Sequence, residues 1–169
     1  MENEMASGCS EPQWKLEMNR ENLAALLHVL TWIAVISVSL LAETDIPAST
    51  AMAKLLGWLI FLFGMFVFAW AVAYLKGAFF GNVEPVSDKL VTTGPYRFVR
   101  HPVYLGMIVS TIGLTIGLRS PWGLAGVFLL FTPTGIYRAR LEESAMARRF
   151  GEEWDEYVKR TCFMFPPMC

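Results

Sequence analysis

The chain has 169 residues, of which 54% are hydrophobic and only 17% charged, and its net charge is −1. A soluble domain of this length usually contains about 25% charged residues, so the composition indicates a membrane protein with its apolar residues gathered into spans. The balanced charge and the lack of a basic patch argue against nucleic-acid binding. The chain has only two histidines and three cysteines, without a CxxC pattern. These counts argue against a metal site and against a disulfide framework.

The distribution of apolar residues predicts an all-α, polytopic membrane protein. A polar N-terminal tail (residues 1–22) precedes a single membrane domain (23–169), and four runs in that domain are expected to be transmembrane helices: 23–42, 53–75, 103–118 and 122–138. A span needs roughly 20 residues, which the first two runs supply and the last two only approach. The intervening Arg119–Pro121 link is so short that the last two spans should form an antiparallel hairpin.

Small residues and one proline refine the prediction for this hairpin. Glycines at 106, 113, 117, 123 and 126 are expected to let its two helices approach closely. Pro133 is expected to kink the fourth span, because proline removes a helical hydrogen bond.

Lysine and arginine residues indicate how the chain is oriented in the membrane. Twelve of them lie in the N-terminal tail, the second loop and the C-terminal segment, whereas the first and third loops hold only Lys54 and Arg119. Because positive charge favours the cytoplasmic side, we expect both termini in the cytoplasm. The protein would be an integral, multi-pass protein of the plasma or inner membrane, or of the endoplasmic reticulum in a eukaryote.

After the fourth span, residues 139–160 are expected to form a cytoplasmic amphipathic helix, or two short helices hinged at Gly151. Glu142, Met146, Phe150 and Trp154 recur at intervals of four and define one face. A carboxylate on that face needs a cationic partner or hydrogen-bond donors, so Glu142 is a candidate functional group. A purely structural ion pair with Arg138, Arg100 or Arg97 is the alternative.

The stretch GPYRFVRHPVYLG (94–106) places arginines, tyrosines and a histidine at the start of the third span. It is either a membrane-interface belt or the wall of a site shared with Glu142 and Glu143. The glycines of KGAFFG, Gly77 and Gly81, are a weaker candidate for ligand contact. His28, alone in the first span, is expected to be a satisfied interior residue without a role.

Taken together, GPYRFVRHPVYLG, a short-linked helical hairpin and EESAMARRFGEEWDEYVKRT resemble the superfamily of isoprenylcysteine carboxyl methyltransferases and phospholipid N-methyltransferases. These are small integral membrane enzymes that use S-adenosylmethionine as methyl donor. The resemblance covers roughly residues 90–166. It implies a cofactor pocket on the cytoplasmic side under the C-terminal helix, with no metal ion, and a lipid or lipidated acceptor that enters from the bilayer.

The resemblance also implies a role for each residue of the motifs. It assigns a catalytic role to Arg97, Arg100 and Glu143. It places the cofactor against Gly94, Tyr96, His101, Tyr104, Leu105 and Glu142.

The sequence leaves the acceptor and two further functions open. A prenylcysteine carboxylate would need an arginine to place it, whereas a phospholipid amine would need a base. A small thiol or another lipophilic acceptor is the third alternative. A similar RHxxYLG-like element and tail occur in NADPH-dependent membrane sterol reductases, which are the alternative enzyme class. A non-catalytic four-helix protein that binds anionic lipid is the alternative outside enzymes. The oligomeric state is not predicted.

Overall fold

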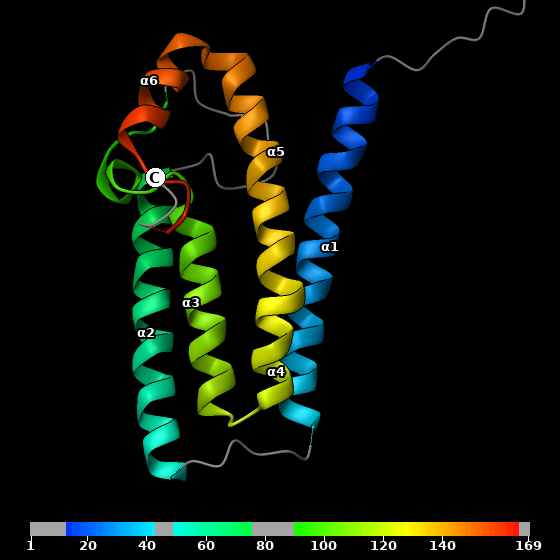
Figure 1. Cartoon of the computed structure of the whole chain (residues 1–169), viewed down its shortest axis with the longest axis vertical. Helices are drawn as coiled ribbons and strands as arrows, with labels where there is room; N and C mark the ends of the chain where they lie inside the picture. Colours follow the sequence, from blue (N-terminus) through cyan, green and yellow to red (C-terminus); the bar gives the residue numbers. More distant parts are fainter. Residues whose placement is uncertain (1–12, 43–48, 76–89, 166–169) are drawn as a thin grey trace, which may run out of the picture.

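The computed structural model describes residues 13–42, 49–75 and 90–165, and within these ranges the protein is helical (Figure 1). Its only strand-like pairing there is an isolated bridge between Val99 and Cys162. The elements are, in chain order, α1 (Gln13–Leu41), α2 (Thr50–Leu75), the 3₁₀ turn η1 (Gly94–Arg97), α3 (Pro102–Gly117), α4 (Pro121–Gly126), the π-turn η2 (Val127–Phe131), α5 (Thr132–Phe150) and α6 (Glu152–Arg160).

Two helices are long and apolar enough to cross a membrane: Arg20–Leu41 within α1, and all of α2. α1 begins at Gln13, ten residues before the predicted first span. α3 is apolar but shorter, with 16 residues. The outward faces of α1 and α2 expose many large apolar side chains, among them Leu40, Leu55 and Phe66, as expected for helices whose solvent is lipid.

The helices pack as two pairs. α2 lies along α3, and α1 lies along the continuous helix formed by α4, η2 and α5 (Figure 1). Glycines bring α2 and α3 together: a Cβ added at Gly113 would lie 2.2 Å from the backbone nitrogen of Phe61, and one added at Gly64 would lie 2.3 Å from that of Ser110. The hairpin prediction was therefore wrong about the partner of these glycines, since Gly106 and Gly113 face α2 and not the fourth span.

The close approach of α2 and α3 predicts that a larger residue at their contact lowers the stability of the protein. Gly113→Ala should lower the melting temperature in detergent by several degrees, because the new methyl group overlaps backbone atoms of α2 that cannot move independently. Gly117→Ala is the matched control in the same helix, since its added Cβ would lie 3.8 Å from Gly57, an ordinary contact. Equal melting temperatures for the two variants would contradict the packing.

The predicted fourth span runs on without a break into the C-terminal region. Pro133 follows a π-turn in which the amide of Thr132 donates to the carbonyl of Val127, five residues earlier. The wider turn adapts the helix to the residue that cannot donate. The helix ends at Phe150, and Gly151 has a φ of +52°, so α6 starts in a new direction. The helix therefore breaks at Gly151 as the two-helix alternative expected, but the helix before the break is not short, since α5 runs from Thr132 to Phe150; the cytoplasmic location of this segment stays a prediction.

Beyond α6, the chain turns back onto the segment that precedes α3. The amides of Arg100 and His101 donate to the carbonyls of Cys162 and Phe163, at 2.8 and 3.1 Å, and Phe163 and Met164 are buried in the core. Cys162 is disulfide-bonded, which the sequence analysis did not anticipate. We call residues 161–165 the C-terminal strap.

Candidate active site

A tight turn places the RHPVY motif at the start of α3. Gly94 adopts a φ of +62°, and a Cβ there would also lie 2.6 Å from the ring of Tyr74, so glycine is required twice over. Pro95 is the second residue of η1. Tyr96 is buried, and its carbonyl accepts a 2.7 Å hydrogen bond from the hydroxyl of Tyr157 on α6. Burial first, and then the charges of Tyr157 and Glu142, raise the pKa of Tyr96 far above its ordinary value, so the phenol stays protonated.

Arg100 holds three parts of the protein together. Its Nε atom donates to Glu143 Oε1 at 2.7 Å. Its Nη1 atom donates to the carbonyl of Val158 at 3.3 Å and to that of Thr161 at the start of the strap. The side chain is 8% exposed. The guanidinium therefore joins the start of α3 to α5 and to the end of α6.

Glu143 uses both of its carboxylate oxygens. Oε1 accepts from Arg100, and Oε2 accepts from Arg140 at 2.8 Å. Burial raises the pKa of Glu143, but its contacts with His101 and Arg100 outweigh that effect and bring the pKa down to about 2. Glu143 is consequently a fixed negative charge at neutral pH and a poor proton acceptor.

Glu142 is less completely bound. Its Oε1 accepts a 2.5 Å hydrogen bond from the hydroxyl of Tyr104 and lies 3.4 Å from Arg138 Nε. Its Oε2 faces His101 Nδ1 at 3.8 Å, which is too far for a hydrogen bond. Among the described residues, this oxygen accepts no hydrogen bond, so Glu142 offers a carboxylate oxygen to a ligand.

His101 lies between the two carboxylates. Nδ1 is 3.8 Å from Glu142 and Nε2 is 3.6 Å from Glu143. The side chain is 7% exposed, and within the described part of the chain Nε2 has no hydrogen-bond partner. Its ring meets the edge of Phe163 at 5.0 Å. A buried ring nitrogen without a partner at such a cluster is typical of a site that is completed by a ligand.

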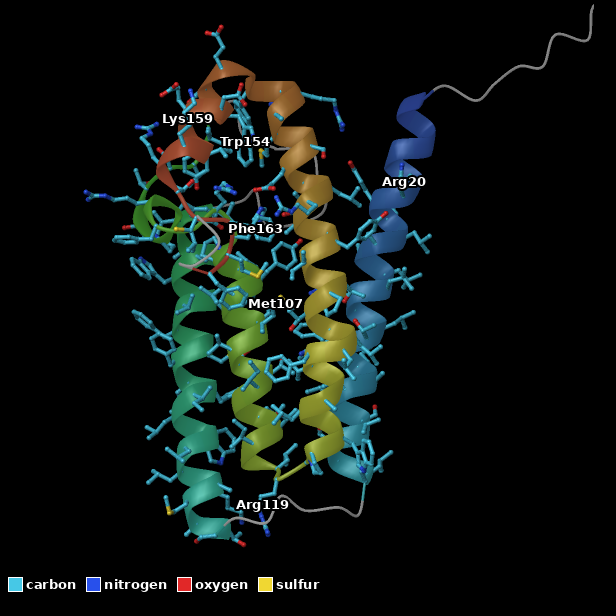
Figure 2. All side chains as sticks on the ribbon, in the orientation of Figure 1. Arg20, Met107, Arg119, Trp154, Lys159 and Phe163 are labelled. Carbon is cyan, nitrogen blue, oxygen red and sulfur yellow. The ribbon has the colours of Figure 1, made fainter. Side chains whose placement is uncertain are left out.

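The structure brings most of the predicted site residues together. Arg100, His101, Tyr104, Glu142 and Glu143 form one cluster at the end of the molecule that α6 covers, where Figure 2 shows Phe163, opposite the end that carries Arg119. The predicted ion pairing of the carboxylates is also present, through Arg138 and Arg100 rather than Arg97.

The other predicted residues lie around this cluster. Arg97 is exposed, and no contact among the described residues joins it to the carboxylates. Leu105 is half-buried against the core. Gly94 shapes the turn, and the backbone of Tyr96 anchors α6. Gly77 and Gly81 lie outside the described residues.

Two features of the site were missed from sequence. One is the strap: Phe163 and Met164 are fully buried, and the guanidinium of Arg140 lies 4.0 Å from the centre of the Phe163 ring. The apolar letters FMF after a charged helix were the available signal. The other is His28, which was expected to be satisfied but whose Nε2 has no partner among the described residues.

The lowered pKa of Glu143 predicts acid sensitivity. A carboxyl with a depressed pKa in the folded protein stabilises it fully above its unfolded pKa, and this stabilisation is lost as the pH falls toward the folded value. The window therefore runs from about pH 4.5 down to about 2, with an effect on the order of 2 kcal/mol. Glu143→Gln should be less stable than wild type at pH 7 and should approach the stability of wild type as the pH falls through this window, measured by thermal unfolding in detergent.

Glu153→Gln is the control, because Glu153 lies on the exposed face of α6. Its stability should match that of wild type at every pH. Parallel curves of stability against pH for all three proteins would contradict the role assigned to Glu143.

One family model covers the region of the chain that contains this cluster. The family model for phospholipid methyltransferase matches residues 52–153. The nickel-cobalt-cadmium resistance protein NccN of Alcaligenes xylosoxydans xylosoxydans is 33% identical over 147 residues, covering 80% of this chain and 62% of the relative. Human protein-S-isoprenylcysteine O-methyltransferase is 37% identical over 81 residues (47% of this chain, 28% of the relative). Phosphatidylethanolamine N-methyltransferase B of Dictyostelium discoideum is 28% identical over 127 residues (69% and 64%).

These alignments show how much of each relative is similar to this chain. The chain spans less than two thirds of the length of each of these relatives. Within the described residues, no group of three histidine, cysteine or acidic side chains is arranged to hold a metal ion.

Proposed function

Because the chain belongs to the phospholipid methyltransferase family, we propose that it transfers a methyl group from S-adenosylmethionine to a lipophilic acceptor at the cytoplasmic face of a membrane. One observation supports this most strongly. The two carboxylates of the cluster under α6 are paired with Arg100, Arg138 and Arg140, yet Glu142 Oε2 and His101 Nε2 have no hydrogen-bond partners among the described residues. A cationic, hydrogen-bonding ligand would satisfy both.

The residues of the cluster fit this methyl donor. S-adenosylmethionine supplies an electrophilic methyl group on a positively charged sulfur, and it also carries an ammonium and a carboxylate. Glu142 is the residue that would pair with the ammonium, because Glu143 already uses both oxygens on Arg100 and Arg140. The Tyr104 hydroxyl orients the Glu142 carboxylate, and His101 offers a ring nitrogen to the same ligand. Alignment of the reactants and exclusion of water are what the protein contributes to such a displacement.

We extend the proposal to the membrane topology. α1 and α2 are the two evident spans. We propose that α3 and the helix Pro121–Arg138 are the other two and that both termini are cytoplasmic, because the cationic residues are concentrated on that side. The cluster would then lie at the cytoplasmic interface, where a lipid headgroup and a water-soluble donor can meet.

The acceptor is a prenylcysteine carboxylate or a phospholipid amine. Relatives with each kind of name resemble the chain. Arg97, an exposed cation in the turn before α3, would place a carboxylate. Arg100 already donates hydrogen bonds to Glu143 and to backbone carbonyls. Its proposed contribution is therefore to fix the positions of the residues that form the site.

Transfer of a labelled methyl group tests the proposal directly. The purified protein in detergent–lipid micelles should move label from S-adenosylmethionine to phosphatidylethanolamine or to a farnesylcysteine analogue, and S-adenosylhomocysteine should inhibit the transfer. If neither acceptor is labelled, and NADPH instead of S-adenosylhomocysteine raises the melting temperature, the methyltransferase assignment is wrong and the reductase class is favoured.

A further inference from the structure

A second polar group lies deeper in the helical bundle than the carboxylate cluster. His28 on α1 is 3% exposed. Its ring stacks on Phe131 with centroids 4.5 Å apart, and it meets the edge of Tyr104 at 5.7 Å. Gly135 leaves room for the ring, since a Cβ there would lie 3.1 Å from His28 Cε1. The imidazole is therefore held by α1, α3, η2 and α5 at once.

Two threonine hydroxyls lie next to His28. The hydroxyl of Thr31 lies 2.9 Å from the carbonyl of His28, and that of Thr134 lies 2.9 Å from the carbonyl of Phe131 and 3.1 Å from the Thr31 hydroxyl. His28 Nδ1 lies 3.1 Å from Thr134 Oγ1. When the Thr134 proton is directed at the Phe131 carbonyl, Nδ1 is the donor in this contact and Nε2 carries the lone pair, which is the tautomer that a proton acceptor at Nε2 requires. Among the described residues, Nε2 has no hydrogen-bond partner.

Tyr104 connects this imidazole to the carboxylate cluster. Its ring packs against His28 in a T-shaped contact, and its hydroxyl donates to Glu142. Glu142 lies seven residues after Gly135 on α5, about 10 Å along the helix. The unpartnered nitrogen is thus on the membrane side of the proposed donor site, where the headgroup of a lipid acceptor would arrive.

We propose that His28 Nε2 is the proton acceptor for the methyl acceptor and that this acceptor is a protonated amine, such as a phosphoethanolamine headgroup. This inference rests on the proposed function. The ammonium nitrogen gives one proton to Nε2 and keeps the bonding electron pair as its nucleophilic lone pair, while the neutral imidazole becomes an imidazolium. The imidazolium returns its proton to water after the product leaves. A carboxylate acceptor has a lone pair already and needs no such group.

The other candidate bases near the site are less suited to this step. Glu143 has a pKa of about 2, and Glu142 is bound by Tyr104 and Arg138. His101 faces both carboxylates and is the group proposed to bind the methyl donor. Nε2 of His28 is buried, so the proposal requires the headgroup of the acceptor to enter the bundle beside α1.

Substitution by asparagine separates a chemical role from a packing role. The amide of His28→Asn can still donate to Thr134 but cannot take a proton, whereas His28→Ala removes both functions. We expect His28→Asn to keep the thermal shift with S-adenosylhomocysteine and to lose at least 100-fold in methyl transfer to phosphatidylethanolamine, the usual range for a lost general base. Transfer to a farnesylcysteine carboxylate, if wild type shows any, should be unchanged by this substitution.

Nitrogen NMR gives a readout that is independent of activity. The chain has two histidines, so the spectrum of ¹⁵N-histidine-labelled protein is assigned by the signals that His28→Asn removes. His28 should show the tautomer with the proton on Nδ1.

The inference is overturned by a proton on Nε2, by unchanged phosphatidylethanolamine methylation in His28→Asn, or by a wild-type protein that methylates only the carboxylate acceptor. None of these results would count against methyl transfer itself. A wild-type protein that binds no S-adenosylhomocysteine and labels neither acceptor would overturn both proposals.

Discussion

Glu142→Gln is expected to abolish the rise in melting temperature that S-adenosylhomocysteine produces in the wild-type protein. The substitution keeps the size of the side chain and an oxygen that can accept from the Tyr104 hydroxyl. It removes the negative charge that would pair with the ligand's ammonium, and a charge-assisted hydrogen bond is worth about 1.5–3 kcal/mol. Affinity should therefore fall at least 10-fold, as measured by titrating the ligand in a thermal-shift or calorimetric assay.

Two further variants make this result interpretable. Glu143→Gln should weaken ligand binding less than Glu142→Gln, because Glu143 is paired with Arg100 and Arg140 and acts through the shape of the site. Glu152→Gln alters an exposed carboxylate of α6 and should bind like wild type. If Glu142→Gln keeps the full ligand-induced shift while remaining folded, Glu142 is not the ammonium partner.

The same experiment distinguishes an enzyme from a passive lipid-binding protein. A four-helix protein that only binds anionic lipid through its basic face has no use for an open carboxylate oxygen beside a buried imidazole. In such a protein Glu142 would be dispensable. In the proposed enzyme the cluster is arranged around that oxygen, which is why the contacts of Glu142, more than its position in the motif, support the functional proposal.

Some of this architecture is predictable from sequence because it depends on local patterns. The first two spans follow from long apolar runs, and the hinge at Gly151 follows from a glycine between two charged helical segments. The convergence of Arg100 and His101 with Glu142 follows from their common position near one end of the predicted hairpin. The helix bounds and the ion pairs show two long apolar helices, the break at Gly151 and the convergence of these side chains; that the helices cross a membrane stays a prediction.

Other features depend on long-range packing that sequence patterns do not encode. The small-residue spacing in the third span shows that a helix packs closely there but not which one, and the partner is α2. The apolar letters of Phe163 and Met164 fit equally a membrane-surface contact or a buried core, and the pairing with residues 98–101 decides for the core. A lone histidine such as His28 gives no sign in sequence of whether its second nitrogen finds a partner.

The strap leads to the second large expected effect, which is on stability. Phe163→Ala should destabilise the protein by about 3–5 kcal/mol, the usual cost of truncating a fully buried phenylalanine. Phe163 is 1% exposed. It also contacts the Arg140 guanidinium and the edge of His101, so the cavity would open directly beside the carboxylate cluster. Thermal unfolding in detergent measures the loss.

Phe98→Ala is the matched control, because Phe98 lies on the segment that pairs with the strap but is 62% exposed. It should change the melting temperature little. At a temperature where Phe163→Ala is still folded, its affinity for S-adenosylhomocysteine should also fall, since His101 and Arg140 lose the ring against which they pack. A Phe163→Ala protein as stable as Phe98→Ala would mean that the strap is not seated in the core. One that is destabilised yet binds the ligand with wild-type affinity would mean that the strap supports the fold and not the site.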